Sequence, residues 1–452
     1  MKKRSISTIF PIENDLTNLF DEKRFDVIVS LSTESLREKE TVEAFFWRAN
    51  AYFAMEKFDA AISDYVSAVT LAPNDPILHF NSGCTLKKLE ATEKAVEAFT
   101  KAIEYDPLYY YSYFNRGNLF QAMEKIPESL NDYTQAIALS PEDADCYVAR
   151  GVSYVKLKKI DEALQDFQAA LRLDPGHAQA LGNCGNAFEM QGRFQEALDA
   201  YNKVLEKNPS DERVFLNRAF VHFRCGQNEE AIKDYTRAIE ICPKRVEIYH
   251  FRGRVHLKIR NYRLALADFD MAIRLSPSDH DEFYLHRSQA KSAISDFTGA
   301  LEDVCKSLKI NPQNWEACCQ LGIIESILGN LPEAIKAYTQ MIDIYSDYSR
   351  GYCYRGVAYA KTGNLKNAFK DYQKAIQLNP GNASAYLNRG LVYRLLKKND
   401  QSIADLSRVI ELDPINIMAY KNRAMAFEAL GKHEEAQKDF STVKQIEMPK
   451  SL

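Results

Sequence analysis

Proline recurs along this sequence at a fixed interval. Successive prolines lie 34 residues apart over most of the chain, with one step of 35 residues, at Pro73, Pro107, Pro141, Pro175, Pro209, Pro243, Pro277, Pro312, Pro380 and Pro414. A period of 34 residues is typical of stacked helix pairs. The sequence therefore predicts an all-α fold, an α-solenoid, whose twelve copies start near Val42, Pro76, Tyr110, Ala144, Ala178, Glu212, Val246, Asp281, Trp315, Ser349, Ala383 and Ile417.

Small residues recur in register with the prolines. The first predicted helix of each copy carries Gly, Ala or Ser at one position, and the second helix carries Ala or Ser at another, as in Gly117 with Ser129 and Gly151 with Ala163. Glycine inside a helix costs about 1 kcal/mol relative to alanine, so its repetition indicates close crossing of two helices. Aromatic residues occupy the large positions between the small ones.

This order of small, aromatic, small, aromatic and proline resembles the tetratricopeptide repeat. The resemblance implies a right-handed superhelix of stacked antiparallel helix pairs. On this reading residues 1–13 form a flexible tail, residues 14–41 a degenerate helical cap, and residues 42–450 the twelve repeats. One inserted residue near Asp281 and polar residues such as Lys291 and Glu325 in core positions predict an irregularity near 280–345.

Arginine and aspartate are lost from the same copies. Nine copies carry both residues, whereas three copies carry neither. This matched loss predicts a partly buried ion pair within each of nine copies. The predicted pairs are Arg48–Asp64, Arg116–Asp132, Arg150–Asp166, Arg218–Asp234, Arg252–Asp268, Arg287–Asp303, Arg355–Asp371, Arg389–Asp405 and Arg423–Asp439.

Asparagine recurs two positions before the small residue of the first helix, in six of the twelve copies. These residues are Asn81, Asn115, Asn183, Asn217, Asn388 and Asn422. An amide can both donate to and accept from a peptide backbone, so they predict a peptide groove, in a pattern similar to the asparagine ladder of the glycosyltransferase repeat superhelix. Further candidates on the same face are Phe46, Trp47, Asn50, Phe80, Tyr111, Phe114 and Asn118. The alternative is that these asparagines bond only to neighbouring helices or water.

The remaining features favour a non-catalytic protein. Charged residues make up 27% of the chain, the net charge is -4, and the nine cysteines include no CxxC spacing. We therefore expect no nucleic acid or membrane partner, no metal, no cofactor and a cytoplasmic location. No Walker loop, GxSxG motif or helical His pair is present.

The function expected from the resemblance is a scaffold that binds extended or helical protein segments in a concave groove. It would work within a larger cytoplasmic assembly, such as a cilium. One alternative is a co-chaperone adaptor for heat-shock chaperones, which is disfavoured because the basic residues of that peptide clamp are missing. Another is an enzyme with a repeat domain, which would need a catalytic domain beyond the repeats.

Overall fold

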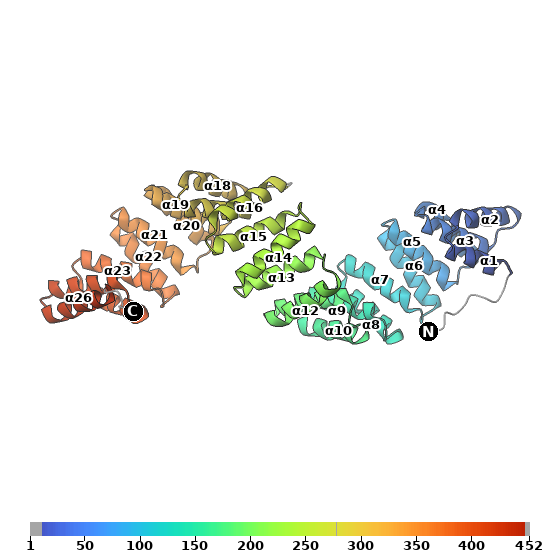
Figure 1. Cartoon of the computed structure of the whole chain (residues 1–452), viewed down its shortest axis with the longest axis horizontal. Helices are drawn as coiled ribbons and strands as arrows, with labels where there is room; N and C mark the ends of the chain where they lie inside the picture. The colour runs from blue at the N-terminus through green and yellow to red at the C-terminus, as the bar shows by residue number, and fades with distance from the viewer. Residues whose placement is uncertain (1–10, 277, 448–452) are drawn as a thin grey trace. The chain divides into compact units, whose positions relative to one another are not determined.

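The computed structural model describes residues 11–276 and 278–447. Over these residues it contains 26 α-helices and no β-strand. The chain divides into two compact units, residues 1–221 and 222–452, and each is described by itself. Within each unit consecutive helices pack as antiparallel pairs, which Figure 1 shows as successive hairpins. The all-α solenoid of stacked helix pairs is confirmed.

The first unit contains the helix pairs up to α12. Its helices are α1 (Pro11–Asp21), α2 (Phe25–Glu38), α3 (Val42–Ala54), α4 (Phe58–Leu71), α5 (Pro76–Lys88), α6 (Thr92–Tyr105), α7 (Tyr110–Ala122), α8 (Ile126–Leu139), α9 (Ala144–Lys156), α10 (Ile160–Leu173), α11 (Ala178–Met190) and α12 (Phe194–Lys207). Helix α13 (Glu212–Arg224) crosses the boundary between the units.

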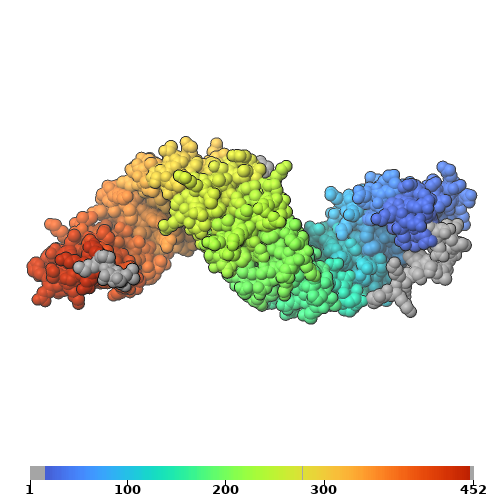
Figure 2. Space-filling view, viewed as in Figure 1, coloured from blue at the N-terminus to red at the C-terminus, as the bar shows by residue number. Residues whose placement is uncertain are grey.

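The second unit continues the same pattern. Its helices are α14 (Asn228–Ile241), α15 (Val246–Lys258), α16 (Tyr262–Leu275), α17 (Asp281–Ala293), α18 (Phe297–Ile310), α19 (Trp315–Leu328), α20 (Leu331–Ile344), α21 (Ser349–Lys361), α22 (Leu365–Leu378), α23 (Ala383–Leu395), α24 (Asn399–Leu412), α25 (Ile417–Ala429) and α26 (His433–Glu447). In both units the first helix of each pair begins at the residue where the sequence predicts a copy to start. In Figure 2, where colour follows residue number, neighbouring repeats within a unit lie directly against each other.

The turn inside each helix pair has one residue in the left-handed backbone region. Five of these residues are glycines, for example Gly192 with φ +74°, and the others include Glu124 with φ +60°. The same turn occurs at Lys23, between α1 and α2. A left-handed residue ends one helix and reverses the chain within a few residues. The first pair therefore has the turn of a repeat, although it lacks the repeat's small residues.

The small residues permit the close crossing that the sequence predicts. A Cβ atom added at Gly151 would lie 2.5 Å from Cε1 of Phe167, and one added at Gly185 would lie 2.4 Å from Cε1 of Tyr201. The aromatic ring of the second helix therefore packs directly on the glycine backbone of the first. The small residue of the second helix, Ala163 in the fourth copy, is fully buried.

The N-terminal boundary differs from the prediction. Helix α1 begins at Pro11, so residues 11–13 are helical and do not belong to the predicted tail. Residues 1–10, which form the rest of that tail, lie outside the described residues, as do residues 448–450 at the end of the predicted array. The α1–α2 pair packs on the first copy, where the Trp47 ring lies 6.3 Å from the Phe20 ring.

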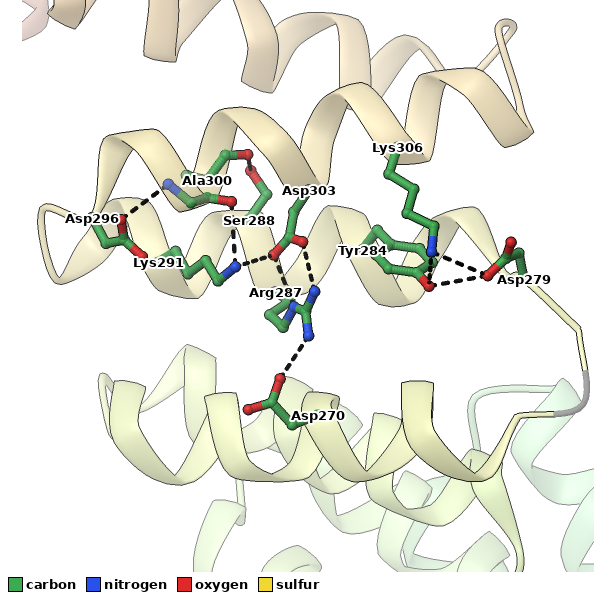
Figure 3. A network of polar contacts seen from close by, with 11 residues as sticks. Asp270, Asp279, Tyr284, Arg287, Ser288, Lys291, Asp296, Ala300, Asp303 and Lys306 are labelled. Carbon is green, nitrogen blue, oxygen red and sulfur yellow. Dashed lines mark hydrogen bonds and ion pairs between the residues drawn. The ribbon is translucent and has the colours of Figure 1, made fainter.

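The irregular eighth copy, α17 and α18, replaces apolar contacts with polar ones (Figure 3). Lys291 occupies the aromatic position, and its Nζ lies 2.9 Å from Oδ2 of Asp303 and 3.3 Å from the carbonyl oxygen of Gly299. Lys306 donates to the Tyr284 hydroxyl at 2.6 Å and lies 3.5 Å from Asp279. The core of this copy is therefore held by charged groups as well as by packing.

Candidate functional site

Arginine and aspartate side chains meet inside eight helix pairs. In each, the arginine Nε and one Nη donate to the two carboxylate oxygens at 2.6–2.9 Å. The aspartate side chains are 2–8% exposed and the arginine side chains 15–20% exposed. These pairs are Arg48–Asp64, Arg116–Asp132, Arg150–Asp166, Arg252–Asp268, Arg287–Asp303, Arg355–Asp371, Arg389–Asp405 and Arg423–Asp439. The ninth pair, Arg218–Asp234, joins residues of different units and stays a prediction.

Most of these arginines also bond to the preceding repeat, which the sequence analysis missed. The other Nη of Arg116 donates to Oγ1 of Thr100 at 3.0 Å. The same contact links Arg48 to Thr33, Arg150 to Thr134, Arg252 to Thr236, Arg355 to Thr339 and Arg423 to Ser407. The signal was present, because a hydroxyl residue lies about 16 positions before each of these arginines.

The contacts of these arginines explain why they do not form a ligand surface. In Arg150 and Arg355, the hydrogen bonds to aspartate raise the guanidinium pKa above its ordinary value. Each planar guanidinium is occupied by one carboxylate and one hydroxyl. In the eighth copy an aspartate replaces the hydroxyl, since Arg287 donates to Asp270 at 2.7 Å (Figure 3). We conclude that these arginines join neighbouring repeats.

Three of the six recurring asparagines bond to their own helix. Asn115, Asn388 and Asn422 each donate from Nδ2 to the carbonyl oxygen four residues earlier, at 2.8–2.9 Å. This local bond accounts for an asparagine that is tolerated within a helix. The carbonyl oxygen of the Asn115 amide also accepts from Lys87 at 3.4 Å. Each of the three amides keeps one N–H for a ligand, because an amide nitrogen has two.

The other three asparagines differ from one another. Asn217 donates to Oδ1 of Asn186 at 2.9 Å, which links α13 to α11 within the first unit. Asn183 has a buried Nδ2 with no hydrogen-bond partner in the part of the chain that the structure describes. Asn81 also has no side-chain hydrogen bond among the described residues. Unsatisfied amides are costly when buried, so Asn183 is a candidate for contact with water or a ligand.

Two predicted contact residues already have structural partners. Oδ1 of Asn50 accepts from the Tyr65 hydroxyl at 2.5 Å, and Oδ1 of Asn118 accepts from Tyr133 at 2.7 Å. The same bond joins Asn186 to Tyr201, which the sequence analysis did not identify. These tyrosines are buried, and their burial raises their pKa. The oxygens of Asn50 and Asn118 therefore satisfy core hydroxyl groups, which leaves only their N–H groups for a peptide.

The predicted aromatic residues fall into two groups. Trp47 and Phe46 lie edge to face at 5.7 Å, and Trp47 packs against the α1–α2 pair. Phe114 lies 6.1 Å from the Tyr133 ring and is partly buried. Phe80 and Tyr111 instead belong to a cluster that reaches the surface. Trp47 therefore joins the cap to the repeats, and the surface cluster is the better candidate for a contact site.

We call this surface cluster the tyrosine patch; it comprises Phe80, Tyr109, Tyr110 and Tyr111. Tyr109 lies edge to face with Phe80 at 5.0 Å, and Tyr110 lies 4.0 Å from Tyr111. The Tyr111 side chain is 46% exposed. Burial raises the pKa of Tyr109 to about 12, so its hydroxyl stays protonated at neutral pH. The neighbouring Leu108 is 75% exposed, which extends the apolar surface of the patch.

The patch lies beside the polar residues of the same two repeats. Asn115 bonds to the carbonyl oxygen of Tyr111, and Lys87 bonds to Asn115. The two tyrosines preceding α7 and at its first residue have defined positions, because the Tyr110 hydroxyl donates to Asp143 at 3.0 Å. An exposed aromatic ring next to amide and ammonium donors can bind an extended peptide through both its backbone and an apolar side chain.

Other kinds of site find little support. Over residues 11–276 and 278–447, no three His, Cys, Asp or Glu side chains are placed to hold a metal ion. The cysteines of this part of the chain are free thiols, and burial raises the pKa of several, including Cys353 to about 11. No described helix is long and apolar enough to cross a membrane.

Comparison with known families gives matches across both units. Models described as tetratricopeptide repeat match residues 42–75, 77–107, 114–178, 148–212, 349–382 and 371–404. A model described as TPR repeat matches residues 221–259. The search of curated proteins found no match.

Solved structures similar to this chain are repeat proteins of several kinds. MamA is 29% identical, covers 37% of this chain and 91% of its own, and has a TM-score of 0.35. The Cut9–Hcn1 structure is 13% identical, covers 91% of this chain and 95% of its own, and has a TM-score of 0.49. Yeast Tom70 is 16% identical, covers 90% of this chain and 99% of its own, and has a TM-score of 0.42.

Proposed function

Because the chain belongs to the tetratricopeptide repeat proteins, we propose that it is a non-catalytic scaffold that binds extended segments of other proteins. Its place of action is a larger cytoplasmic assembly, for which a cilium is one candidate. The contact face is the side of the first helices that carries the recurring asparagines. The principal site lies in the first unit, and a weaker one lies around Asn388 and Asn422.

The tyrosine patch is the observation that carries this proposal. Exposed aromatic side chains are costly unless they contact a partner, and they are common among the residues that dominate binding energy. Here Tyr111 is 46% exposed beside Asn115, whose amide keeps one free N–H. A bound segment would place an apolar side chain on Tyr111 and a backbone carbonyl on the Asn115 amide. Asn81 and Asn183 supply further amides along the same face.

The test compares partners captured by the purified full chain and by variants. Changing Asn81, Asn115, Asn183 and Asn217 together to alanine should abolish capture, because each loses the donor and acceptor of its amide. Helical circular dichroism and melting temperature should stay close to those of the unchanged chain. Partners are identified by affinity purification and mass spectrometry.

A matched pair of single variants separates the face from general stability. Asn115→Ala alters the proposed face, whereas Asn131→Ala alters the exposed side of α8 in the same repeat. Capture should fall for the first variant only. If the folded fourfold variant captures the same partners in the same amounts as the unchanged chain, the asparagine face is not the binding site.

A further inference from the structure

Helix α15 presents basic and imidazole side chains in one row. His250, Arg254 and Lys258 are spaced four residues apart, so they lie on the same side of this helix. Nε2 of His250 lies 3.1 Å from Nδ1 of His286 on α17, the first helix of the next repeat. We call His250, Arg254, Lys258 and His286 the Arg254 cluster. All four residues belong to the second unit.

Arg254 differs from the paired arginines of the array. Two positions away, Arg252 donates to both carboxylate oxygens of Asp268 and to Thr236. Arg254 is partly buried, yet it has no hydrogen bond or ion pair among the described residues. A guanidinium that is partly removed from water without a countercharge is unfavourable, and an added anion would relieve this cost.

The hydrogen bonds of the two histidines leave one ring nitrogen available. Nδ1 of His286 lies 2.7 Å from the carbonyl oxygen of Glu282, so this nitrogen carries the proton and donates it. Nε2 of His250 faces the same N–H and acts as an acceptor. Nε2 of His286 has no bond to any described residue. When protonated, this nitrogen would become a second donor beside Arg254.

The charges around the cluster keep both histidines neutral when no anion is bound. Burial lowers the pKa of His250 to about 3 and that of His286 to about 4, and the positive charge of Arg254 lowers both further. His280 also lowers the pKa of His250, whereas Asp281 raises that of His286. An anion on Arg254 would cancel part of this repulsion and would favour protonation of His286.

We propose that the Arg254 cluster binds a side-chain carboxylate of an acidic protein segment. Arg254 supplies a permanent charge with a planar pair of donors, and His286 supplies a donor that forms as the anion binds. Lys258 is exposed, with its Nζ 4.4 Å from the Phe223 ring, and adds positive charge at the edge of the site. The ligand is an acidic stretch of a partner, held where the first helices of two repeats meet.

The surroundings argue against a nucleic acid at this place. Glu247 lies one turn before His250, and Glu282 lies one turn before His286, and both side chains are exposed. A phosphate backbone carries a charge on every nucleotide and would be repelled by these carboxylates. A peptide with few carboxylates can place one on Arg254 and direct neutral residues past the two glutamates.

Fluorescence anisotropy at low ionic strength tests the site with the full chain. The probe is an amidated, fluorescein-labelled peptide GSAEEEASG, compared with the same peptide carrying glutamine in place of glutamate. The glutamate peptide should bind more tightly, and R254Q should weaken it roughly tenfold, the loss expected for a charge-assisted hydrogen bond. The control R274Q removes an exposed arginine from α16 of the same repeat and should have no effect.

A second readout reports the histidine. With ¹³C-labelled imidazole, NMR should show the pKa of His286 rising when the glutamate peptide is added, and no rise in R254Q. Circular dichroism confirms that R254Q remains folded, and R254K, which keeps the charge but loses the planar pair of donors, should retain part of the affinity.

The proposal is overturned by any of three results. These are equal affinity for the glutamate and glutamine peptides, unchanged affinity in folded R254Q, and tighter Arg254-dependent binding of an oligouridine. An uncharged peptide with a free C-terminus distinguishes the source of the carboxylate, since its exclusive binding would also contradict the side-chain assignment. The proposal shares with the proposed function only the assumption of a protein ligand, and the asparagine variants leave the Arg254 cluster intact, so either can fail alone.

Discussion

At the residue scale, the contacts of the paired arginines explain why three copies lack both partners. The charges are nearly buried, since the Asp132 side chain is 2% exposed and that of Arg116 is 15% exposed. Removing one partner would leave the other charged and unpaired, whereas removing both removes the cost as well as the attraction. The second, fifth and ninth copies carry Ser82 with Ala98, Cys184 with Ala200, and Leu321 with Ala337 at these positions.

A double-mutant cycle on Arg116 and Asp132 tests this explanation. Arg116→Leu and Asp132→Ala should each lower the free energy of unfolding by about 3–5 kcal/mol, because each strands a buried charge. The double variant, which reproduces the residues of the ninth copy, should lose much less than the sum of the two. Urea unfolding of the three variants measures these values. Additive losses would show that the two side chains do not stabilise each other.

At the element scale, glycines within one helix have different roles. In α11 a Cβ atom on Gly185 would lie 2.4 Å from the Tyr201 ring, whereas one on Gly182 would meet no atom within 4 Å. The helix pair can approach closely only at Gly185. Gly182 therefore carries the conformational cost of glycine in a helix without a packing benefit inside the chain.

Alanine at these two glycines should act in opposite directions. Gly182→Ala should raise the free energy of unfolding by about 0.5–1 kcal/mol, because alanine favours the helix. Gly185→Ala should lower it by about 1–3 kcal/mol, because the Tyr201 ring must shift. Both values come from thermal or urea unfolding. If both variants destabilise the chain alike, the close contact at Gly185 does not explain its glycine.

The sequence predicts the elements better than the contacts between them. A period of 34 residues locates the first helix of every copy, because the repeated small and aromatic residues report the same packing twelve times. The hydroxyl on Thr100 and the acceptor role of Asn118 were not predicted, since each depends on how one helix pair is placed against a residue elsewhere. The start of α1 was predicted too late, because the first pair lacks the small residues that mark a copy.

At the scale of the whole array, stability is close to a sum of contacts between neighbouring repeats. The sequence predicts that an array of this kind opens first near residues 281–345. The structure adds polar contacts there, among them Lys291–Asp303 and Arg287–Asp270. It also places His250 against His286, so that one interface between repeats depends on two buried imidazoles.

This histidine pair makes the opening of the array depend on pH. The folded pKa values, about 3 for His250 and about 4 for His286, lie below the value near 6.5 of an unfolded chain. Above pH 6.5 both states hold neutral rings, so the pair causes no pH dependence there. Below it the unfolded state binds protons first, and stability falls by up to about 1.4 kcal/mol per pH unit for each histidine.

Hydrogen exchange at pH 7 and pH 5, corrected for the intrinsic exchange rate, should therefore show protection lost first in α15 to α18 as the pH falls. The other helices should change less, because their contacts do not include a neutral buried pair of this kind. Replacing both histidines, as H250Q/H286Q, should lower stability at pH 7 but remove most of this local pH dependence. An even loss along the chain, or an unchanged local loss in the double variant, would show that acid opens the array elsewhere.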